Sequence, residues 1–336
     1  MNETKVEQNK KIELSETTKT SNRSAEALDR LFTFAAVIIL FIIFSIVAPY
    51  FFTVRNVLDL ALQTCTITMM GIGVTFCIIT GGIDLSIGSV VALTGTIAVI
   101  VAIRGVPIWL SIIIGVLVGV VTGSINGLMV TRLKLPPFIA TLGMMMVARG
   151  VALTITNANS YSAPQGFSGL GNDTLFGTGR QFPGIPYPVI IMIVVALVFG
   201  FLLSRTRLGR YIYATGSNEE AARLSGININ QIKVTVYIIC GMLSGLVGVI
   251  LASRMVSSQP NSAVGYELNA IAAAIIGGTS FMGGVGTILG TVIGSFIIGI
   301  LTVGLTMAGA NYFMQQIVIG LVVIGSVTLD QVRTRR

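Results

Sequence analysis

Beyond residue 30, long apolar segments follow one another with only short polar or glycine-rich stretches between them. A helix needs about 20 residues to cross a hydrocarbon core about 30 Å thick. Of the 34 charged side chains (21 basic plus 13 acidic), 12 lie in residues 1–30, so the other 306 residues share 22. A soluble domain of that size needs far more charge on its surface. The sequence therefore predicts an all-α polytopic membrane protein.

Ten segments are long enough, or nearly long enough, to span the bilayer. The expected spans are 31–48, 57–79, 85–103, 108–130, 137–155, 187–204, 232–252, 268–281, 285–306 and 312–329. The number depends most on the short spans next to 81–84 and 277–284. Residues 1–30 are polar and lack large apolar clusters, which predicts a disordered tail ahead of one transmembrane domain over 31–330.

The positions of Lys and Arg predict the orientation, because cytoplasmic loops carry an excess of these residues. Sixteen of the 21 basic residues lie in the tail, in 131–136, in 205–233 and at the C-terminus. With ten spans all four groups fall on one side, so both termini are expected in the cytoplasm. The segment 157–186 is then a long external loop and 205–231 a cytoplasmic loop.

Several classes of function are excluded by missing residue types. The chain has no histidine, which removes His-based zinc sites, triads and proton relays. No lysine follows a glycine, so a P-loop of the form GxxxxGK[ST] is absent, and ATP-driven work would require a partner. Cys65, Cys77 and Cys240 lie in apolar stretches and are interpreted as free buried thiols. We expect no catalytic residue, metal or cofactor.

A glycine-rich motif interrupts the second span at Gly81, Gly82, Asp84 and Ser86. Asp84 is the only acid between Asp59 and Asp173, and an acid at membrane depth usually faces a cavity or the protein interior. Broken helices are tolerated where they line a pathway. Alternatively, Asp84 caps the helix that begins near Leu85. Both interpretations stay open, and they are compatible.

A second glycine-rich stretch follows the eighth span and contains Gly277, Gly278, Thr279 and Ser280. It resembles the segment 81–88, either as an internal repeat or through the glycine bias of membrane chains. The small residues would line a pathway or allow close helix packing. Asn126, a polar group in an apolar run, would either face the pathway or bridge helices.

Within the cytoplasmic loop, residues 217–225 (SNEEAARLS) predict a short helix outside the bilayer, closed by Gly226. Such a helix either connects two spans or docks a cytoplasmic partner.

Four longer motifs carry a resemblance to a known family. TRLGRYIYATGSNEEAARLSGIN (206–228) resembles the cytoplasmic loop of the permease subunits of bacterial monosaccharide ABC importers, including the ribose permease family. GGIDLSIGSVVALTG (81–95), PFIATLGMMMVARG (137–150) and GYELNAIAAAIIGGTSFMGG (265–284) are similar to segments of the same family, and the likeness extends over about 31–330.

The resemblance implies an inner-membrane permease that imports ribose or a similar monosaccharide. Such permeases pair as two copies, bind an ABC ATPase subunit and receive the sugar from a periplasmic or lipid-anchored binding protein. By resemblance, the ATPase-coupling helix comprises Gly216, which would start it, Ser217, Asn218, Glu219, Glu220, Ala221, Ala222, Arg223 and Gly226, which would end it. The sugar would pass between the copies, past 81–89 and 277–284. The alternative is a stand-alone secondary carrier or channel for small polar solutes.

Overall fold

The computed structural model describes residues 34–177 and 183–334, so the predicted tail lies outside the described residues. Apart from the first described helix, Phe34–Val47, the helices are α2 (Val54–Ile79), α3 (Ile87–Ile103), α4 (Ile108–Thr131), α5 (Pro137–Thr156), α6 (Gly169–Asn172), α7 (Tyr187–Arg205), α8 (Arg207–Ser217), α9 (Glu219–Leu224), α10 (Ile229–Met255), α11 (Tyr266–Ile276), α12 (Ile288–Met307) and α13 (Tyr312–Thr334).

Among these residues, six helices are long and apolar enough to cross a membrane: α2, α4, α5, α7, α10 and α12. Four shorter apolar helices accompany them, at Phe34–Val47, in α3, in α11 and in the first part of α13. Each of the ten predicted spans overlaps one of these helices, although α11 ends at Ile276, five residues before the predicted end of the span 268–281. The all-α polytopic fold is therefore confirmed.

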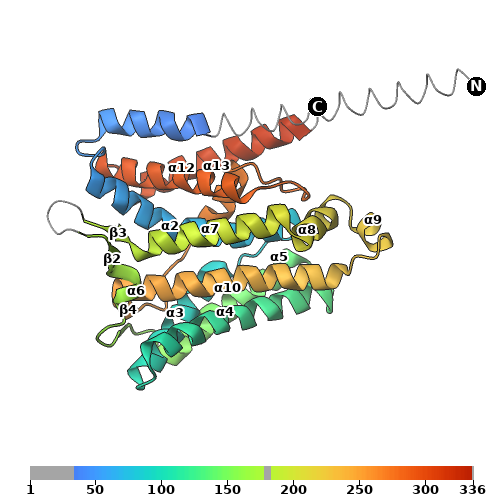
Figure 1. Cartoon of the computed structure of the whole chain (residues 1–336), viewed down its shortest axis with the longest axis horizontal. Helices are drawn as coiled ribbons and strands as arrows, with labels where there is room; N and C mark the ends of the chain where they lie inside the picture. The colour runs from blue at the N-terminus through green and yellow to red at the C-terminus, as the bar shows by residue number, and fades with distance from the viewer. Residues whose placement is uncertain (1–33, 178–182, 335–336) are drawn as a thin grey trace, which may run out of the picture.

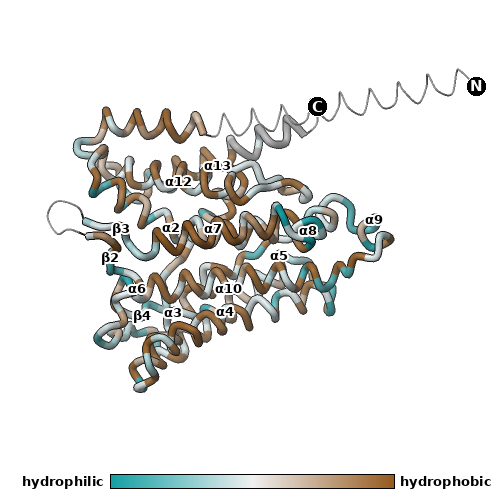
Figure 2. Tube along the Cα trace, in the orientation of Figure 1, coloured by the Kyte–Doolittle hydropathy of each residue, from teal (hydrophilic) through white to brown (hydrophobic). Residues whose placement is uncertain are grey.

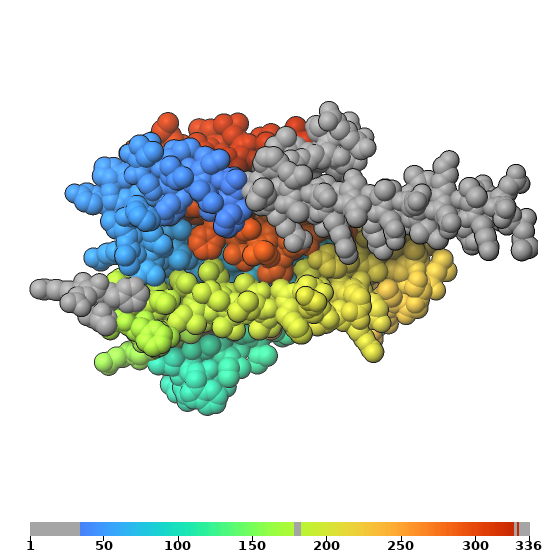
Figure 3. All heavy atoms as spheres, turned by 45° about the horizontal axis from the view of Figure 1, so that its top comes forward, coloured from blue at the N-terminus to red at the C-terminus, as the bar shows by residue number. Residues whose placement is uncertain are grey.

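Helices α2 and α10 form the centre of the molecule. In the most apolar window of each helix, 83% of α2 and 67% of α10 is buried, compared with 28% of α4 and α5 and 33% of α7. Helix α10 packs against α4, α3 and α2, and α12 packs against α2 and α11 (Figure 1). The peripheral helices remain apolar (Figure 2), and α7 crosses one face of the molecule as a yellow-green band (Figure 3). Exposed apolar faces of this kind suit lipid contact.

Glycines bring α4 and α10 into backbone contact. Gly115, Gly119, Gly123 and Gly127 recur every fourth residue and are buried on the side of α4 that faces α10. A Cβ at Gly119 would collide with the carbonyl oxygen of Gly241 in α10, and one at Gly123 with that of Tyr237. Small residues at every fourth position allow such close packing in membrane proteins.

The two ends of the helix bundle differ (Figure 1). At one end β1 (Tyr161–Ser162) pairs antiparallel with β4 (Ser257–Ser258), and β2 (Thr174–Leu175) pairs with β3 (Ile185–Pro186). Together with α6, these strands give the predicted external loop a defined structure. At the opposite end lie α8, α9 and the end of α13.

The short helix predicted at 217–225 differs in the structure. Ser217 ends α8, and α9 covers only Glu219–Leu224. Asn218 separates the two helices because its extended backbone leaves the helical region while its Oδ1 accepts the Ala221 N–H at 2.9 Å. Gly216 therefore lies inside α8 and does not start the predicted helix. Gly226, with φ of 82°, follows the end of α9 as predicted.

Candidate functional site

The first break, residues 80–86, separates α2 from α3 and contains a buried polar cluster. Oδ1 of Asp84 accepts the backbone N–H of Ser86 at 2.9 Å and its hydroxyl at 2.6 Å. Nδ2 of Asn126, on α4, donates to Oγ of Ser86 at 2.9 Å. All three residues are at most 2% exposed. The cluster therefore fixes the break to α4.

The helix after the first break does not begin where the sequence predicted. Helix α3 starts at Ile87, and Ser86 occupies the N-cap position. Asp84 lies two residues earlier, where it closes a turn on Ser86 instead of capping a helix that begins near Leu85. Asp and Ser are both residue types that suit an N-cap, and the helix begins after Ser86 instead of after Asp84.

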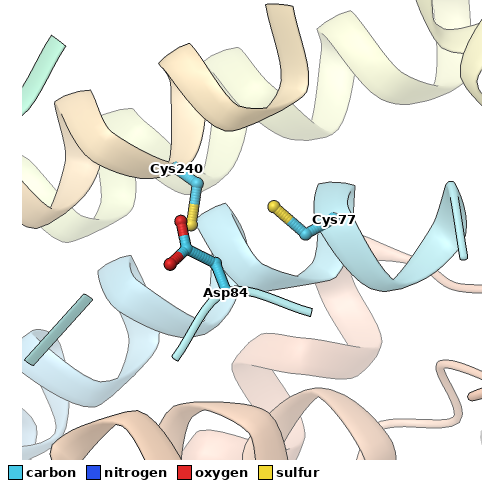
Figure 4. A group of neighbouring side chains, drawn as sticks. All are labelled: Cys77, Asp84 and Cys240. Atoms are coloured by element: carbon cyan, nitrogen blue, oxygen red, sulfur yellow. The ribbon is translucent and has the colours of Figure 1, made fainter. Parts of the chain in front are cut away.

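Two thiols complete the surroundings of Asp84. Cys77 in α2 and Cys240 in α10 point toward the carboxylate (Figure 4), and the ligand atoms of the three residues lie within 4.8 Å of one another. Thiolates and a carboxylate are ligand types for zinc and softer metals. The set is fully buried. All three cysteines are buried and free, as the sequence analysis expected.

Other helices hold the backbone of the first break. Oγ1 of Thr141, on α5, donates to the carbonyl oxygen of Ile83 at 3.2 Å. Gly82 lies against Tyr237 of α10, because a Cβ there would stand 2.6 Å from the phenol oxygen. Four helices, α2, α4, α5 and α10, thus surround this interruption.

The second break, residues 277–287, lies between α11 and α12. Three of its glycines, Gly278, Gly283 and Gly284, have positive φ angles of 87°, 82° and 74°. The Ser280 N–H donates to the carbonyl oxygen of Val285 at 3.1 Å, which folds the segment back on itself. Thr279 is buried at 1% exposure. A left-handed backbone at three positions explains the glycine content.

The two breaks meet at one point, and α8 lies on that point. The Gly284 N–H donates to the carbonyl oxygen of Ile79, the last residue of α2, at 2.8 Å. A Cβ on Gly216 of α8 would collide with the same carbonyl oxygen and stand 2.7 Å from the Gly284 nitrogen. The Tyr213 hydroxyl donates to the Gly286 carbonyl oxygen at 2.6 Å. We call Ile79, Gly216 and Gly284 the glycine junction.

Helix α9 is fastened to α10 by an ion pair. Glu219 lies 2.7 Å from Nζ of Lys233 and 3.2 Å from the Arg223 guanidinium. The hydrogen bond from Lys233 is the main cause that lowers the pKa of Glu219. Ala222 is buried beneath the helix, whereas Leu224 is 84% exposed. The outer face of α9 thus offers an apolar side chain and charges to solvent.

The candidate pathway residues are divided by their burial. Gly81 and Gly278 are exposed and Ser280 is half-buried. The buried ones hold the breaks in place: Gly82, Asp84, Ser86, Asn126 and Thr279 are all buried, and Gly277 lies against the backbone of Gly290. Whether any of them contacts a transported molecule stays a prediction.

Sequence reasoning missed the residues that join these segments. Ile79, Tyr213 and Tyr237 are ordinary apolar or aromatic members of their helices, and nothing local marks them. One feature of the sequence could have marked Cys77 and Cys240 as site residues: each is a polarizable thiol close to polar or small residues. Their proximity to Asp84 depends on contacts across more than 150 residues of chain in the case of Cys240, which a single sequence does not reveal.

The comparisons with known proteins agree with this architecture. The sequence model of a family described as the permease component of the branched-chain amino acid transport system matches residues 56–327. That match covers well over half of the 336 residues. The chain belongs to this family of transport-system permeases.

Individual relatives extend over nearly the whole chain. It is 43% identical to the ribose import permease protein RbsC of Escherichia coli (strain K12) over 298 residues, covering 88% of this chain and 91% of the relative. It is 44% identical to RbsC of Bacillus subtilis (strain 168), covering 90% and 93%. The D-allose transport system permease protein AlsC of E. coli K12 is 40% identical, covering 90% and 92%. No solved structure matches.

Proposed function

We propose that the chain is the membrane-spanning subunit of an ATP-binding-cassette importer for a monosaccharide, ribose or a similar sugar. The observation that carries the proposal is its similarity, over about nine-tenths of both chains, to permeases named for ribose and allose. A separate ATPase supplies the energy, and a periplasmic or lipid-anchored sugar-binding protein delivers the substrate. The importer lies in the bacterial inner membrane with two copies of this chain side by side.

In this proposal the end of the molecule that carries α8 and α9 faces the cytoplasm, together with both termini. Its support is the charge pattern, since Arg205, Arg207, Arg210, Arg223 and Lys233 all belong to this end. Residues 31–330 then form the permease domain, residues 1–30 a cytoplasmic tail, 157–186 the external loop and 205–231 the coupling loop.

The ATPase seats on the coupling helix, from Asn218 through Gly226, against the exposed face around Leu224. Its movement reaches the two breaks through α8, because Gly216 lies directly on the carbonyl oxygen of Ile79 and the amide of Gly284. No flexible side chain separates α8 from the breaks at this contact. A displacement of α8 is therefore passed to both breaks together.

The sugar passes along the exposed parts of the breaks, represented by Gly81, Gly278 and Ser280. Backbone groups and small polar side chains suit sugar hydroxyls, and weak contacts favour release. In this proposal the buried cluster of Asp84, Ser86 and Asn126 does not contact the sugar. It acts indirectly, because it sets the position of the first break. Gly82, Gly277 and Thr279 support the breaks in the same way.

The test is ATPase activity in proteoliposomes that contain this chain, the sugar-importer ATPase and the binding protein from the same source. A panel of monosaccharides is added, with assembly of the complex verified separately. Stimulation by one sugar supports the proposal and names the substrate. An assembled complex that no monosaccharide stimulates contradicts it. Uptake that an uncoupler abolishes and that ATPase loss leaves unchanged would support the stand-alone carrier instead.

A further inference from the structure

A basic cleft opens at the α8–α9 end of the molecule, between α9 and the adjoining ends of α4 and α10. Its volume is about 520 Å³, enough for a phosphate group with a polar substituent. It is lined by Val130, Thr131, Lys134, Glu219, Arg223, Ile227, Asn228, Ile229, Asn230 and Lys233. Neither break nor the glycine junction contributes to it.

The charge of the cleft is unbalanced. Three basic side chains and one carboxylate line it, which leaves a net charge of +2 (3 − 1). The carboxylate, Glu219, is already paired with Arg223 and Lys233. No acidic side chain within the described ranges forms an ion pair with Lys134. The cleft therefore holds cationic groups that an anion would neutralise.

Neutral hydrogen-bond donors support the same polarity. Ile229 and Asn230 belong to the first turn of α10, where backbone N–H groups have no partner inside the helix. The Asn228 side chain caps Gln231 at 3.2 Å and leaves these two earlier positions uncapped. The partial positive charge at the N-terminal end of α10 therefore adds to the positive charge that Lys134 and Lys233 bring to the cleft.

An apolar surface leads to the cleft along α4. Leu117, Val121, Ile125 and Leu128 recur every three or four residues on the exposed side of α4, with exposures of 42–56%. This face ends just before Val130 and Thr131, which line the cleft. An acyl chain on the face would place its headgroup at the level of the cleft, and basic clefts between transmembrane helices suit anionic headgroups.

We propose that this cleft binds a phosphate group, and that its source is an anionic phospholipid of the adjacent leaflet. Lys134 contacts the phosphate as an unpaired cation, and Lys233 and Arg223 contribute while they hold Glu219. The bound headgroup bridges the end of α4 to α9 and so steadies α9 on α10. The proposal concerns a lipid site and holds whether or not the transported solute is a sugar.

The test measures binding of dioleoylphosphatidylglycerol to the purified full-length chain in neutral detergent, by native mass spectrometry and by the midpoint of thermal unfolding. Dioleoylphosphatidylcholine and inorganic phosphate are added in parallel. The expected result is stabilisation by phosphatidylglycerol alone. Lys134→Gln should weaken this binding about fivefold, because the headgroup loses its contact with the unpaired cation of the cleft. Arg132→Gln, which removes a cation outside the cleft, should leave it unchanged.

A second variant guards against misfolding. Asn230→Glu adds a carboxylate where acidic residues favour a helix start, so α10 keeps its fold while the cleft loses positive charge. Reduced lipid binding by this variant supports the proposal. Equal binding of both lipids, or unchanged binding by Lys134→Gln and Asn230→Glu, overturns the site. Inorganic phosphate that stabilises the chain as well as phosphatidylglycerol does overturns the lipid source and identifies a soluble phosphate compound.

Discussion

The amide of Gly284 and the carbonyl oxygen of Ile79 form a 2.8 Å hydrogen bond that joins two helix breaks 205 residues apart (284 − 79). One partner ends α2 and the other lies between α11 and α12. Because Gly216 of α8 packs against both atoms, three distant segments share one contact. Through this contact, α8, which belongs to the loop 205–231, directly touches both helix breaks.

Gly216→Ala tests this contact. The added methyl group would collide with the Ile79 carbonyl oxygen, so α8 must move off the glycine junction. We expect the ATPase still to bind, because α9 is unchanged, while sugar-stimulated ATP hydrolysis falls about tenfold, within the usual range of coupling energies. Gly320→Ala is the matched control, since no atom lies within 4 Å of that site. Normal coupling in Gly216→Ala would contradict transmission through the junction.

The double substitution Glu219→Lys with Ala221→Arg tests the docking surface. It replaces one of the two acids of α9, the one paired with Lys233, and adds a bulky cation to an exposed position. We expect loss of ATPase binding in a pull-down with the chain still monodisperse in detergent. Ala308→Arg, an exposed change at the opposite end of the molecule, should leave binding intact. If the double variant binds the ATPase normally, α9 is not the coupling helix.

Asp84 allows structural and functional roles to be separated. Asp84→Asn keeps an oxygen for the Ser86 N–H, so we expect a loss of about 1 kcal/mol in the free energy of unfolding. Asp84→Ala leaves the Ser86 donors and the Asn126 amide buried without this acceptor, and about 3 kcal/mol is expected. Denaturation in detergent measures both. Transport that fails in Asp84→Asn at normal expression and stability would show that the charge itself is required; equal stability losses would reject the hydrogen-bond argument.

The pairing of Glu219 predicts a pH effect on α9. Its pKa is lowered from the ordinary value of 4.5, mainly by the hydrogen bond from Lys233. A lowered folded-state pKa means that the stabilisation is present above about 4.5 and is lost as the pH falls through the folded value. The rate of amide hydrogen exchange in α9, corrected for intrinsic rates, should therefore rise as the pH falls below the folded-state pKa of Glu219. Lys233→Gln should show the faster exchange already at pH 7, and identical exchange in both proteins would contradict the pairing.

Local patterns were sufficient to predict the apolar helices, whereas α6 and α8 lie in segments that were predicted as loops. Apolar length identified ten segments, and each overlaps a described helix, with 268–281 extending past the end of α11. The breaks were visible because glycine pairs such as Gly81–Gly82 and Gly277–Gly278 interrupt apolar runs. The start of α3 was harder to predict, because Asp84 and Ser86 are both residue types that suit an N-cap, and Ser86 occupies that position.

The candidate site was predictable only in parts. Sequence reasoning selected both breaks and the coupling loop separately, but it had no means to place Gly216 on Ile79. That contact depends on the packing of α8 under the ends of two other helices, which leaves no periodic or compositional trace in any of them. The same holds for Lys134 and Lys233, which are 99 residues apart (233 − 134) yet line one cleft.

The glycine contacts between α4 and α10 limit how the molecule can rearrange. Gly119 and Gly241 meet backbone to backbone, so neither helix can slide past the other without forcing main-chain atoms together. Helices α4 and α10 are therefore expected to move together as one rigid body. A displacement of α9 that reaches α10 through the ion pair with Lys233 would therefore also move α4, together with Asn126 and the first break that it holds.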